Sequence, residues 1–144
     1  MAQRLRDVMT DQIVTLPPSA SVMEAGKAMA DNDIGNVIVV DEGAVAGILT
    51  DRDIVVRAIA KGTDPTKTRI GEIVSEDVQT LPADASIGDA VRMMSDRAIR
   101  RIPVVEDGRP VGVVSIGDLV NWVMTQQDFT IHQLEDYITG KYPG

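Results

Sequence analysis

The sequence predicts an α+β fold in which two β-α-β-β-α units pack on one another about a pseudo-twofold axis. Three observations lead to this prediction: an internal repeat, the same order of hydrophobic patterns in each copy, and a length of 144 residues. A unit of roughly 55 residues buries too little surface to be stable alone, so the two copies are expected to share one core. The chain is therefore expected to form a single module.

The repeat emerges when the sequence is aligned with itself at an offset of 65 residues, which places Val8 to Ala60 over Ile73 to Thr125 without a gap. Identical residues recur along the whole alignment, more often than average composition gives by chance. They include Thr15/Thr80, Leu16/Leu81, Pro17/Pro82, Ala20/Ala85, Ser21/Ser86, Met29/Met94, Val39/Val104, Gly43/Gly108, Gly47/Gly112 and Asp53/Asp118. We place repeat 1 at residues 1–65, repeat 2 at residues 66–125 and a C-terminal tail at residues 126–144.

Each copy begins with a short β-prone run, at residues 13–16 and 78–81, that a proline ends because it cannot continue a ladder of hydrogen bonds. A helix is expected next, with Ser19 and Asp84 as its N-caps in the two copies. Apolar residues recur there at spacings of three and four, which predicts one buried stripe on each helix. These residues are Val22, Ala25 and Met29, and Ile87, Ala90 and Met94.

Two strands and a second helix complete each copy. The strands are expected at residues 37–40 and 44–49, and at residues 102–105 and 111–114. Gly43 and Gly108 stand in the joining turns, where a short hairpin often needs a left-handed conformation. The second helices are expected at about residues 51–60 and 116–126, and a short amphipathic helix is expected in the tail.

Composition excludes several classes of function. The net charge of -8 opposes nonspecific binding to nucleic acid, which draws on Lys and Arg to neutralise phosphates. The absence of cysteine excludes disulfides, thiolate nucleophiles and Cys-ligated zinc. No signal peptide and no apolar run of roughly 18 residues is present, so we expect a cytoplasmic protein without a membrane segment. His132 is the only histidine, so neither a metal site nor a histidine-based triad is expected.

The strongest motif closes the second strand of each copy and reads Gly-x-x-[Ser/Thr]-x-x-Asp. A hydroxyl residue followed three residues later by an acidic one is typical of a helix capping box. Alternatively, the carboxylate could accept hydrogen bonds from two ribose hydroxyls, while the hydroxyl and the unpaired amides of the helix N-terminus face a phosphate. Both interpretations stay open, because one residue set can serve as cap and as ligand. The residues are Gly47, Thr50 and Asp53, and Gly112, Ser115 and Asp118.

The gapless repeat, its order of elements and the two motif copies resemble a pair of CBS (cystathionine-β-synthase-type) domains, also called a Bateman module, over about residues 4–125. The resemblance implies a regulatory module that binds an adenine nucleotide, forms a homodimer and acts on a separate, unidentified effector protein. It implies AMP, ADP or ATP as the ligand, with S-adenosylmethionine and NADH as alternatives. It implies no catalytic residue, no metal and no required cofactor.

The resemblance also implies roles for matching residues. In such modules the Asp of the motif holds ribose, the Ser or Thr meets phosphate, and adenine lies between apolar strands. Arginine suits phosphate because its fork of donors matches paired oxygens. The implied nucleotide-binding residues are Thr10, Ile13, Gly47, Thr50, Arg52, Asp53, Ser75, Val78, Arg100, Arg101, Pro103, Gly112, Ser115 and Asp118.

The two copies differ in charge. Gly35 and Asn36 stand where the second copy has Arg100 and Arg101, and Gly117 stands where the first copy has Arg52. Whether both clefts bind, and whether they bind the same ligand, therefore stays open. A structural or protein-interaction dimer with vestigial clefts is the alternative function. An enzyme is not expected, because no nucleophile-base pair, metal cluster or Gly-rich phosphate loop is present.

Overall fold

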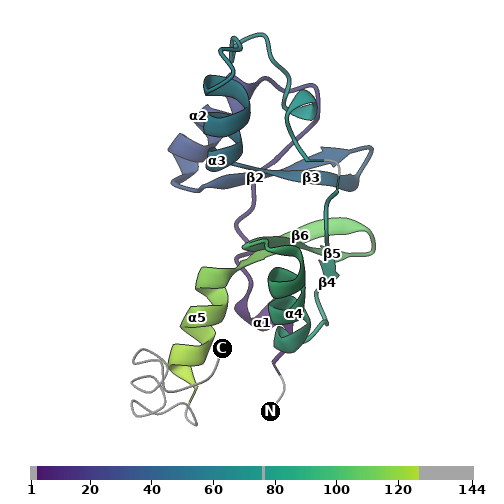
Figure 1. Ribbon diagram of the computed structural model, residues 1–144. Coiled ribbons are helices and arrows are strands. Elements are labelled where there is room, and N and C mark those ends of the chain that lie inside the picture. Colours follow the sequence, from purple (N-terminus) through teal and green to yellow (C-terminus); the bar gives the residue numbers. More distant parts are fainter. Residues whose placement is uncertain (1–2, 76, 127–144) are drawn as a thin grey trace, which may run out of the picture.

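The computed structural model describes residues 3–75 and 77–126 and has the predicted α+β architecture (Figure 1). The helix expected in the tail, together with His132, lies outside the described residues. Within them, no helix is long and apolar enough to cross a membrane. The elements are α1 (Leu5–Val8), β1 (Thr15–Leu16), α2 (Val22–Asn32), β2 (Asn36–Asp41), β3 (Ala44–Thr50), α3 (Asp51–Ile54), η1 (Val55–Ile59), η2 (Ile70–Glu72), β4 (Leu81–Pro82), α4 (Ile87–Arg97), β5 (Arg101–Glu106), β6 (Arg109–Ser115) and α5 (Ile116–Thr125).

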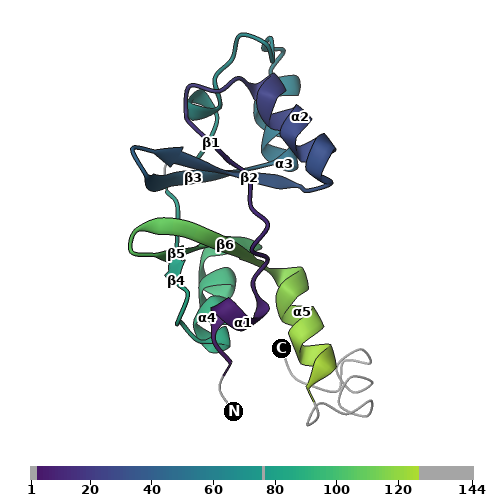
Figure 2. The same cartoon turned by 180° about the vertical axis from the view of Figure 1, so that it is seen from behind.

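Two three-stranded sheets face each other at the centre of the molecule, and the helices cover their outer sides (Figures 1 and 2). The strand order is β1-β2-β3 in one sheet and β4-β5-β6 in the other. In each sheet the first strand runs parallel to the second, and the second pairs with the third as an antiparallel hairpin. The two sheets meet through β3 and β6. This arrangement is the expected packing of two equivalent units.

The central strands are buried on both faces, as their uninterrupted apolar runs indicate. Val37 and Val39 belong to a core cluster beneath the helices of the first repeat, whereas Ile38 between them is equally buried but lies outside that cluster. Because successive side chains of a strand point to opposite faces, Ile38 faces the other sheet. Pro103 occupies the equivalent position of β5 and is also fully buried. The molecule thus has one core in each repeat and an apolar contact between the sheets.

The hairpin turns have the conformation that the glycines predicted. Glu42 and Gly43 both have positive φ, at 52° and 84°, and Asp107 and Gly108 have φ of 52° and 78°. Two consecutive residues with positive φ form the turn whose twist matches that of paired strands. Both hairpins also shift register at the same place, between Val39 and Val40 and between the equivalent residues of β5. The repeat therefore extends to irregular details of the backbone.

Because of Pro103, the parallel pairing of the second sheet starts one residue later in the repeat than that of the first sheet. In the first sheet, Thr15 pairs with Ile38, and the backbone N–H of Ile38 donates to Val14 O. Proline has no N–H to donate, so the equivalent bond is lost at Pro103. Accordingly β4 begins at Leu81, one position later in the repeat than β1. The missing donor explains why the pairing of β4 with β5 starts one position later than that of β1 with β2.

The caps of α2 and α4 correct the sequence prediction. Ser19 and Asp84 do not cap these helices; Ser21 and Ser86 do, and their hydroxyls accept hydrogen bonds from the N–H groups of Glu24 and Asp89. Residues 17–20 and 82–85 instead form a turn closed by an N–H bond back to the proline carbonyl. This turn delays each helix by two residues. In α4 the Ser86 backbone and hydroxyl lower the pKa of Asp89 below its ordinary value, with a smaller effect of Arg92.

The second helix of the first repeat also differs from the single helix expected at about residues 51–60. It consists of α3 followed by a π-helical turn, η1, in which Ala60 N–H donates to Val55 O. The wider turn coincides with the β-branched run Ile54-Val55-Val56, whose side chains crowd an α-helix. The equivalent segment of the second repeat, α5, is a continuous α-helix over ten residues.

Each repeat completes its core with the segment that precedes the other repeat. Leu5 of α1 is fully buried in the core of the second repeat, and its N–H donates to Ala85 O. Ile70 of η2 is fully buried in the core of the first repeat, and its N–H donates to Ala20 O. Residues 5 and 70 are equivalent in the repeat, so this exchange obeys the pseudo-twofold relation. The two halves are consequently interlocked.

The exchanged segments cross the sheets at the glycines that begin the two motifs. A Cβ atom on Gly112 would lie 2.5 Å from Met9 Sδ and 2.9 Å from Thr10 O. A Cβ atom on Gly47 would lie 2.6 Å from Val74 Cγ2 and 3.3 Å from Ser75 O. Real Cβ atoms essentially never come within 3.0 Å of another atom, so a side chain at either crossing would force its neighbours to shift. The motif glycines are thus explained by packing of protein on protein.

We expect Gly112→Ala to lower the free energy of unfolding by about 1–3 kcal/mol, because the added methyl overpacks the crossing at Thr10. Gly26→Ala is the matched control: nothing lies within 4 Å of its Cβ position in α2, so it should gain roughly 0.5–1 kcal/mol from helix propensity. Urea unfolding followed by circular dichroism measures both. Equal stability of the two variants would contradict the crossing.

Candidate functional site

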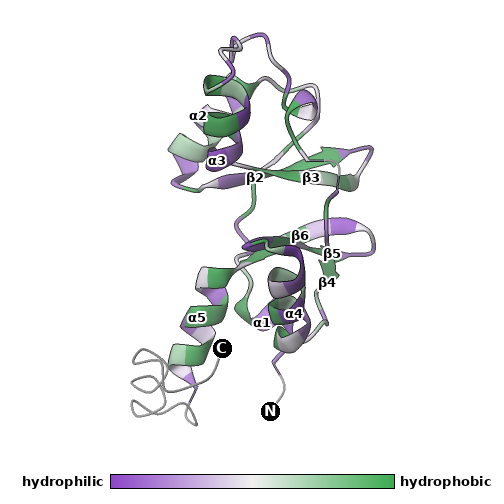
Figure 3. Ribbon diagram, in the orientation of Figure 1, coloured by the Kyte–Doolittle hydropathy of each residue, from purple (hydrophilic) through white to green (hydrophobic). Residues whose placement is uncertain are grey.

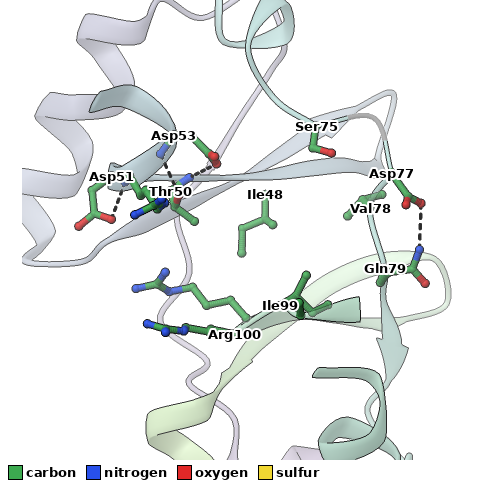
Figure 4. Close-up of a pocket in the computed structure, with 13 residues that line it drawn as sticks. Ile48, Thr50, Asp51, Asp53, Ser75, Asp77, Val78, Gln79, Ile99 and Arg100 are labelled. Atoms are coloured by element: carbon green, nitrogen blue, oxygen red, sulfur yellow. Dashed lines mark hydrogen bonds between the residues drawn. The ribbon is translucent and has the colours of Figure 1, made fainter. Parts of the chain in front are cut away.

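The larger of two clefts opens between the sheets and has a volume of about 720 Å³ (Figure 4). One side is formed by the end of β3 and the start of α3, and the other by the segment before β5. The loop after residue 74 closes the end. The lining residues are Ile48, Thr50, Asp51, Arg52, Asp53, Ser75, Asp77, Val78, Gln79, Ala98, Ile99, Arg100 and Arg101. Both repeats contribute, so this first cleft is a feature of the pair.

A second, smaller cleft of about 230 Å³ lies at the equivalent place in the other repeat. Its lining residues are Thr10, Gln12, Ile13, Ile34, Gly35, Asn36, Arg101, Val113, Ser115 and Asp118. Except for Arg101, each of these is related to a residue of the first cleft by the repeat offset of 65. The pseudo-twofold axis that relates the repeats therefore also relates the clefts.

The motif of the first repeat forms a complete capping box at the start of α3. Thr50 N–H donates to Asp53 Oδ2 at 2.9 Å, and Asp53 N–H donates to Thr50 Oγ1 at 3.1 Å. The other carboxylate oxygen, Oδ1, lies 3.9 Å from Arg57 Nε. The Asp53 side chain keeps 25% of its surface exposed. It is held in a fixed orientation at the cleft, with acceptor capacity to spare.

The second repeat has the same capping box at the start of α5. Ser115 N–H donates to Asp118 Oδ2 at 2.9 Å, and Asp118 N–H donates to Ser115 Oγ at 3.1 Å. Thr10 Oγ1 donates to Asp118 Oδ1 at 3.3 Å. The capping interpretation of both motifs is thus confirmed. Both carboxylates are partly buried and line a cleft.

The amides of the first turn of α3 are not free, contrary to the expectation that they would face a phosphate. Asp51 N–H donates to Gly35 O at 3.0 Å, and Arg52 N–H donates to Asp51 Oδ1 at 2.8 Å. Asp53 N–H is used by the capping box. In α5, Ile116 N–H donates to Arg100 O at 2.9 Å. An anion in the first cleft would therefore depend on side-chain donors, namely hydroxyl and guanidinium groups.

The arginines supply those donors in the first cleft. Arg52 and Arg100 are exposed and Arg101 is half-buried, and all three line it. Figure 4 shows Arg100 across the cleft from Thr50 and Asp53, with Asp77 at the far end beside Gln79. Ile48, Val78 and Ile99 lie between these polar groups. The cleft thus combines a cationic end with an apolar middle.

The sequence-predicted residues divide into three groups by position. The first cleft is lined by Thr50, Arg52, Asp53, Ser75, Val78, Arg100 and Arg101. The second cleft is lined by Thr10, Ile13, Ser115 and Asp118, with Arg101 shared. Neither lining includes Gly47, Gly112 or Pro103. The two glycines lie beneath the crossing segments, and Pro103 is buried between the sheets, so none of the three side-chain positions faces a cleft.

Sequence reasoning missed several lining residues. Asp51, Asp77 and Gln79 line the first cleft, and Gln12 lines the second. Ile48 of β3 and Val113 of β6 were also missed, although each stands inside a motif, one position after its glycine. Some of them could have been predicted from their neighbours in sequence. Once Ser75 and Val78 are placed at a cleft, Asp77 and Gln79 are expected to lie there as well. No group of His, Asp and Glu able to hold a metal occurs among the described residues.

Comparison with protein families gives two matches to the CBS domain, at residues 5–59 and 70–125. The chain is 36% identical over 115 residues to the CBS domain-containing protein YhcV of Bacillus subtilis, covering 80% of this chain and 81% of that protein. Proteins built on a pair of CBS domains are commonly regulatory sensors of nucleotides or other ligands.

Solved structures share the fold. The CBS domain pair of protein MJ0100, in complex with 5'-methylthioadenosine and S-adenosyl-L-methionine, has a TM-score of 0.76 and 31% identity, covering 85% of this chain and 96% of that one. A hexameric CBS-CP12 protein from bloom-forming cyanobacteria has a TM-score of 0.78 and 26% identity, covering 97% and 78%. With both repeats matched in sequence and in structure, this chain belongs to the CBS domain family as a tandem pair.

Proposed function

We propose that this chain is an adenine-nucleotide sensor that acts in the cytoplasm on a separate effector protein, without catalysis of its own. The observation that carries the proposal is the pair of equivalent clefts, each with a partly buried carboxylate held by a capping box beside a hydroxyl. A cleft with a carboxylate held in this way suits a ligand that carries two neighbouring hydrogen-bond donors. The likeness to the MJ0100 domain pair, solved with two adenosine compounds, supports the same ligand class.

The carboxylates suit a ribose. Asp53 uses one oxygen for the Thr50 N–H, and the remaining lone pairs of the carboxylate can each accept a hydroxyl of a sugar diol. Such hydrogen bonds to a charged acceptor are stronger than those between neutral groups. Asp118 offers the same arrangement once Thr10 releases Oδ1 or shares it. Ribose binding and helix capping therefore use different lone pairs of one side chain.

The remaining parts of the nucleotide fit the other groups of the first cleft. The Thr50 hydroxyl accepts from Asp53 N–H, so its own proton is free to donate to a phosphate oxygen. Arg100 and Arg52 add charged donors at the same end. Ile48 and Val78 provide apolar surface for an adenine ring. Backbone groups of Ser75, Asp77 and Val78 are then placed to contact its polar edge.

Binding would be transmitted through the packing of the repeats. Each cleft is lined by residues of both halves, so a bound nucleotide stabilises the arrangement in which the two halves match its shape. The resulting shift between arrangements is limited by the difference in nucleotide affinity between them. An effector that contacts one arrangement preferentially would then respond to the nucleotide.

We expect an adenosine compound from a panel of AMP, ADP, ATP, S-adenosylmethionine and NADH to bind in isothermal titration calorimetry. The double variant Asp53→Asn with Asp118→Asn should lose at least about tenfold in affinity, since hydrogen bonds to charged groups contribute about 1.5–3 kcal/mol. Asparagine keeps a capping oxygen, so the fold should survive.

Asp89→Asn is the matched control for this test. Asp89 forms the same capping box with Ser86 at α4 but lines neither cleft, so its substitution should leave affinity unchanged. Absence of binding by every compound in the panel would refute the sensor function and favour the structural dimer with vestigial clefts.

We also propose that the module forms a homodimer through the apolar faces of α3-η1 and α5. Val55 and Ile59 are 53% and 62% exposed, and the equivalent residues of α5, Val120 and Met124, are 56% and 54% exposed. Figure 3 shows hydrophobic residues, in green, recurring along the α5 ribbon between paler and purple ones. Because the two faces are related by the pseudo-twofold axis, one copy presents two matching apolar strips to a second copy. Exposed apolar strips of this kind mark association surfaces.

Ile59→Lys combined with Met124→Lys should convert the dimer to monomer, because two charges would be buried in the contact. Light scattering coupled to size-exclusion chromatography measures the mass. Glu42→Lys in the β2-β3 turn makes the same change in net charge and should leave the dimer intact. A monomeric wild-type protein, or a hexamer that survives the substitutions, would overturn this part of the proposal.

A further inference from the structure

The two clefts share their backbone geometry but differ in positive charge. Arg52, Arg100 and Arg101 all line the first cleft. Of the residues that line the second, Arg101 is the one cation, and the positions equivalent to the other two arginines hold Gly35 and Gly117. Since the amides of α3 are already paired, these guanidinium groups decide how much negative charge the first cleft can hold.

Arg101 lines both clefts, and its side chain reaches toward a carboxylate of the first. Its backbone pairs with Ser115 of the second cleft. Its guanidinium, however, extends over Gly35: a Cβ atom there would lie 3.2 Å from both Arg101 Nη2 and Asp51 Oδ2. Asp51 belongs to the first cleft. The absence of a side chain at residue 35 thus lets the single shared cation reach toward the first cleft.

The carboxylates of the first cleft offset only part of this charge where a phosphate chain would lie. Asp77 is at the opposite end from Arg100 and accepts a hydrogen bond from Gln79 at 3.0 Å (Figure 4). Asp53 is held by its capping box, and Asp51 accepts from Arg52 N–H. The three arginines therefore outnumber the acidic groups near Thr50, where only Asp51 and Asp53 stand.

The cleft with more arginines is also the larger of the two. The first has a volume of about 720 Å³, within the usual range for pockets that bury a whole ligand. The second has about 230 Å³, which is below that range of roughly 300–1,000 Å³. More volume and more cationic donors in one cleft favour a longer, more highly charged ligand there.

We propose that the first cleft selects adenosine compounds with a di- or triphosphate chain, and that the second takes adenosine compounds with little or no negative charge. This inference rests on the proposed function, because it assigns ligand classes to the same two clefts. One module would then respond separately to a polyphosphate and to an uncharged adenosine compound.

Calorimetry with adenosine, AMP, ADP and ATP on two single variants tests the assignment. Asp118→Asn impairs the second cleft and reports on the first, where affinity should rise at least about tenfold from adenosine to ATP. Asp53→Asn impairs the first cleft and reports on the second, where affinity should stay level or fall along the same series. Raising the salt concentration should weaken ATP binding in the first case only.

A second experiment substitutes the residues at which the two clefts differ in charge. Arg52→Gln with Arg100→Gln, made in the Asp118→Asn background, should remove the preference for ATP while adenosine binding persists. Both arginine side chains are exposed, so this variant should fold. Gly117→Arg in the Asp53→Asn background should create a preference for ATP. Ser115 Oγ, at 3.6 Å, is the nearest atom to the new Cβ position, so the side chain has room.

The outcomes separate this inference from the proposed function. Binding of the series with equal preference at both clefts, or a preference for ATP that survives loss of Arg52 and Arg100, overturns the assignment and leaves the sensor intact. Failure of all four compounds to bind the unmodified protein overturns the assignment, and the proposed function falls with it only when S-adenosylmethionine and NADH fail to bind as well. The assignment is supported if affinity rises from adenosine to ATP in the first cleft alone and if this rise requires Arg52 and Arg100.

Discussion

The exchange of leading segments between the two repeats is the contact on which the rest of the structure depends. Leu5 fills the core of the second repeat and Ile70 that of the first, and both are fully buried. Burial of one such side chain contributes about 1.5–3 kcal/mol, and the adjoining backbone hydrogen bonds add to it. Separation of the halves would open both cores. Neither repeat is therefore a finished domain, and the clefts between them are a consequence of how the pair closes.

The same exchange brings the groups of each cleft together. After crossing the sheet at Gly112, the chain reaches Thr10, whose hydroxyl donates to Asp118 of the other repeat. By the same path Ser75 follows the crossing at Gly47 and lines the first cleft. The segment that locks the fold is thus continuous with the segment that lines the site. A ligand that moves the lining would also act on the core, because close-packed interiors transmit small shifts.

Much of the fold was predictable because its signals are local. The β-prone runs, the apolar stripes of the helices and the turn glycines Gly43 and Gly108 can each be recognised from residues close in sequence. The repeat shows each of these patterns twice. The N-caps were wrong because Ser19 and Ser21 both satisfy the capping preference, and only the intervening turn decides between them. The exchange itself was missed, since no periodicity relates Leu5 to Ala85. The capping boxes were predicted, whereas the pairing of the amides beside them depends on the carbonyls of Gly35 and Arg100, which stand just before β2 and β5.

The two clefts share their helix caps and glycine crossings, and they differ in positive charge and in volume. Asp53 and Asp118 each close a helix cap, so a change at either would disturb the fold as well as any ligand. Arg52 and Arg100 are exposed, and their side chains make no hydrogen bond or ion pair to the described residues, so the fold does not require them. A duplicated module can therefore keep its caps and crossings fixed while its arginines differ. Under the proposed assignment, ligand class is set at positions that stability leaves free, so two clefts with the same helix caps can serve two ligands.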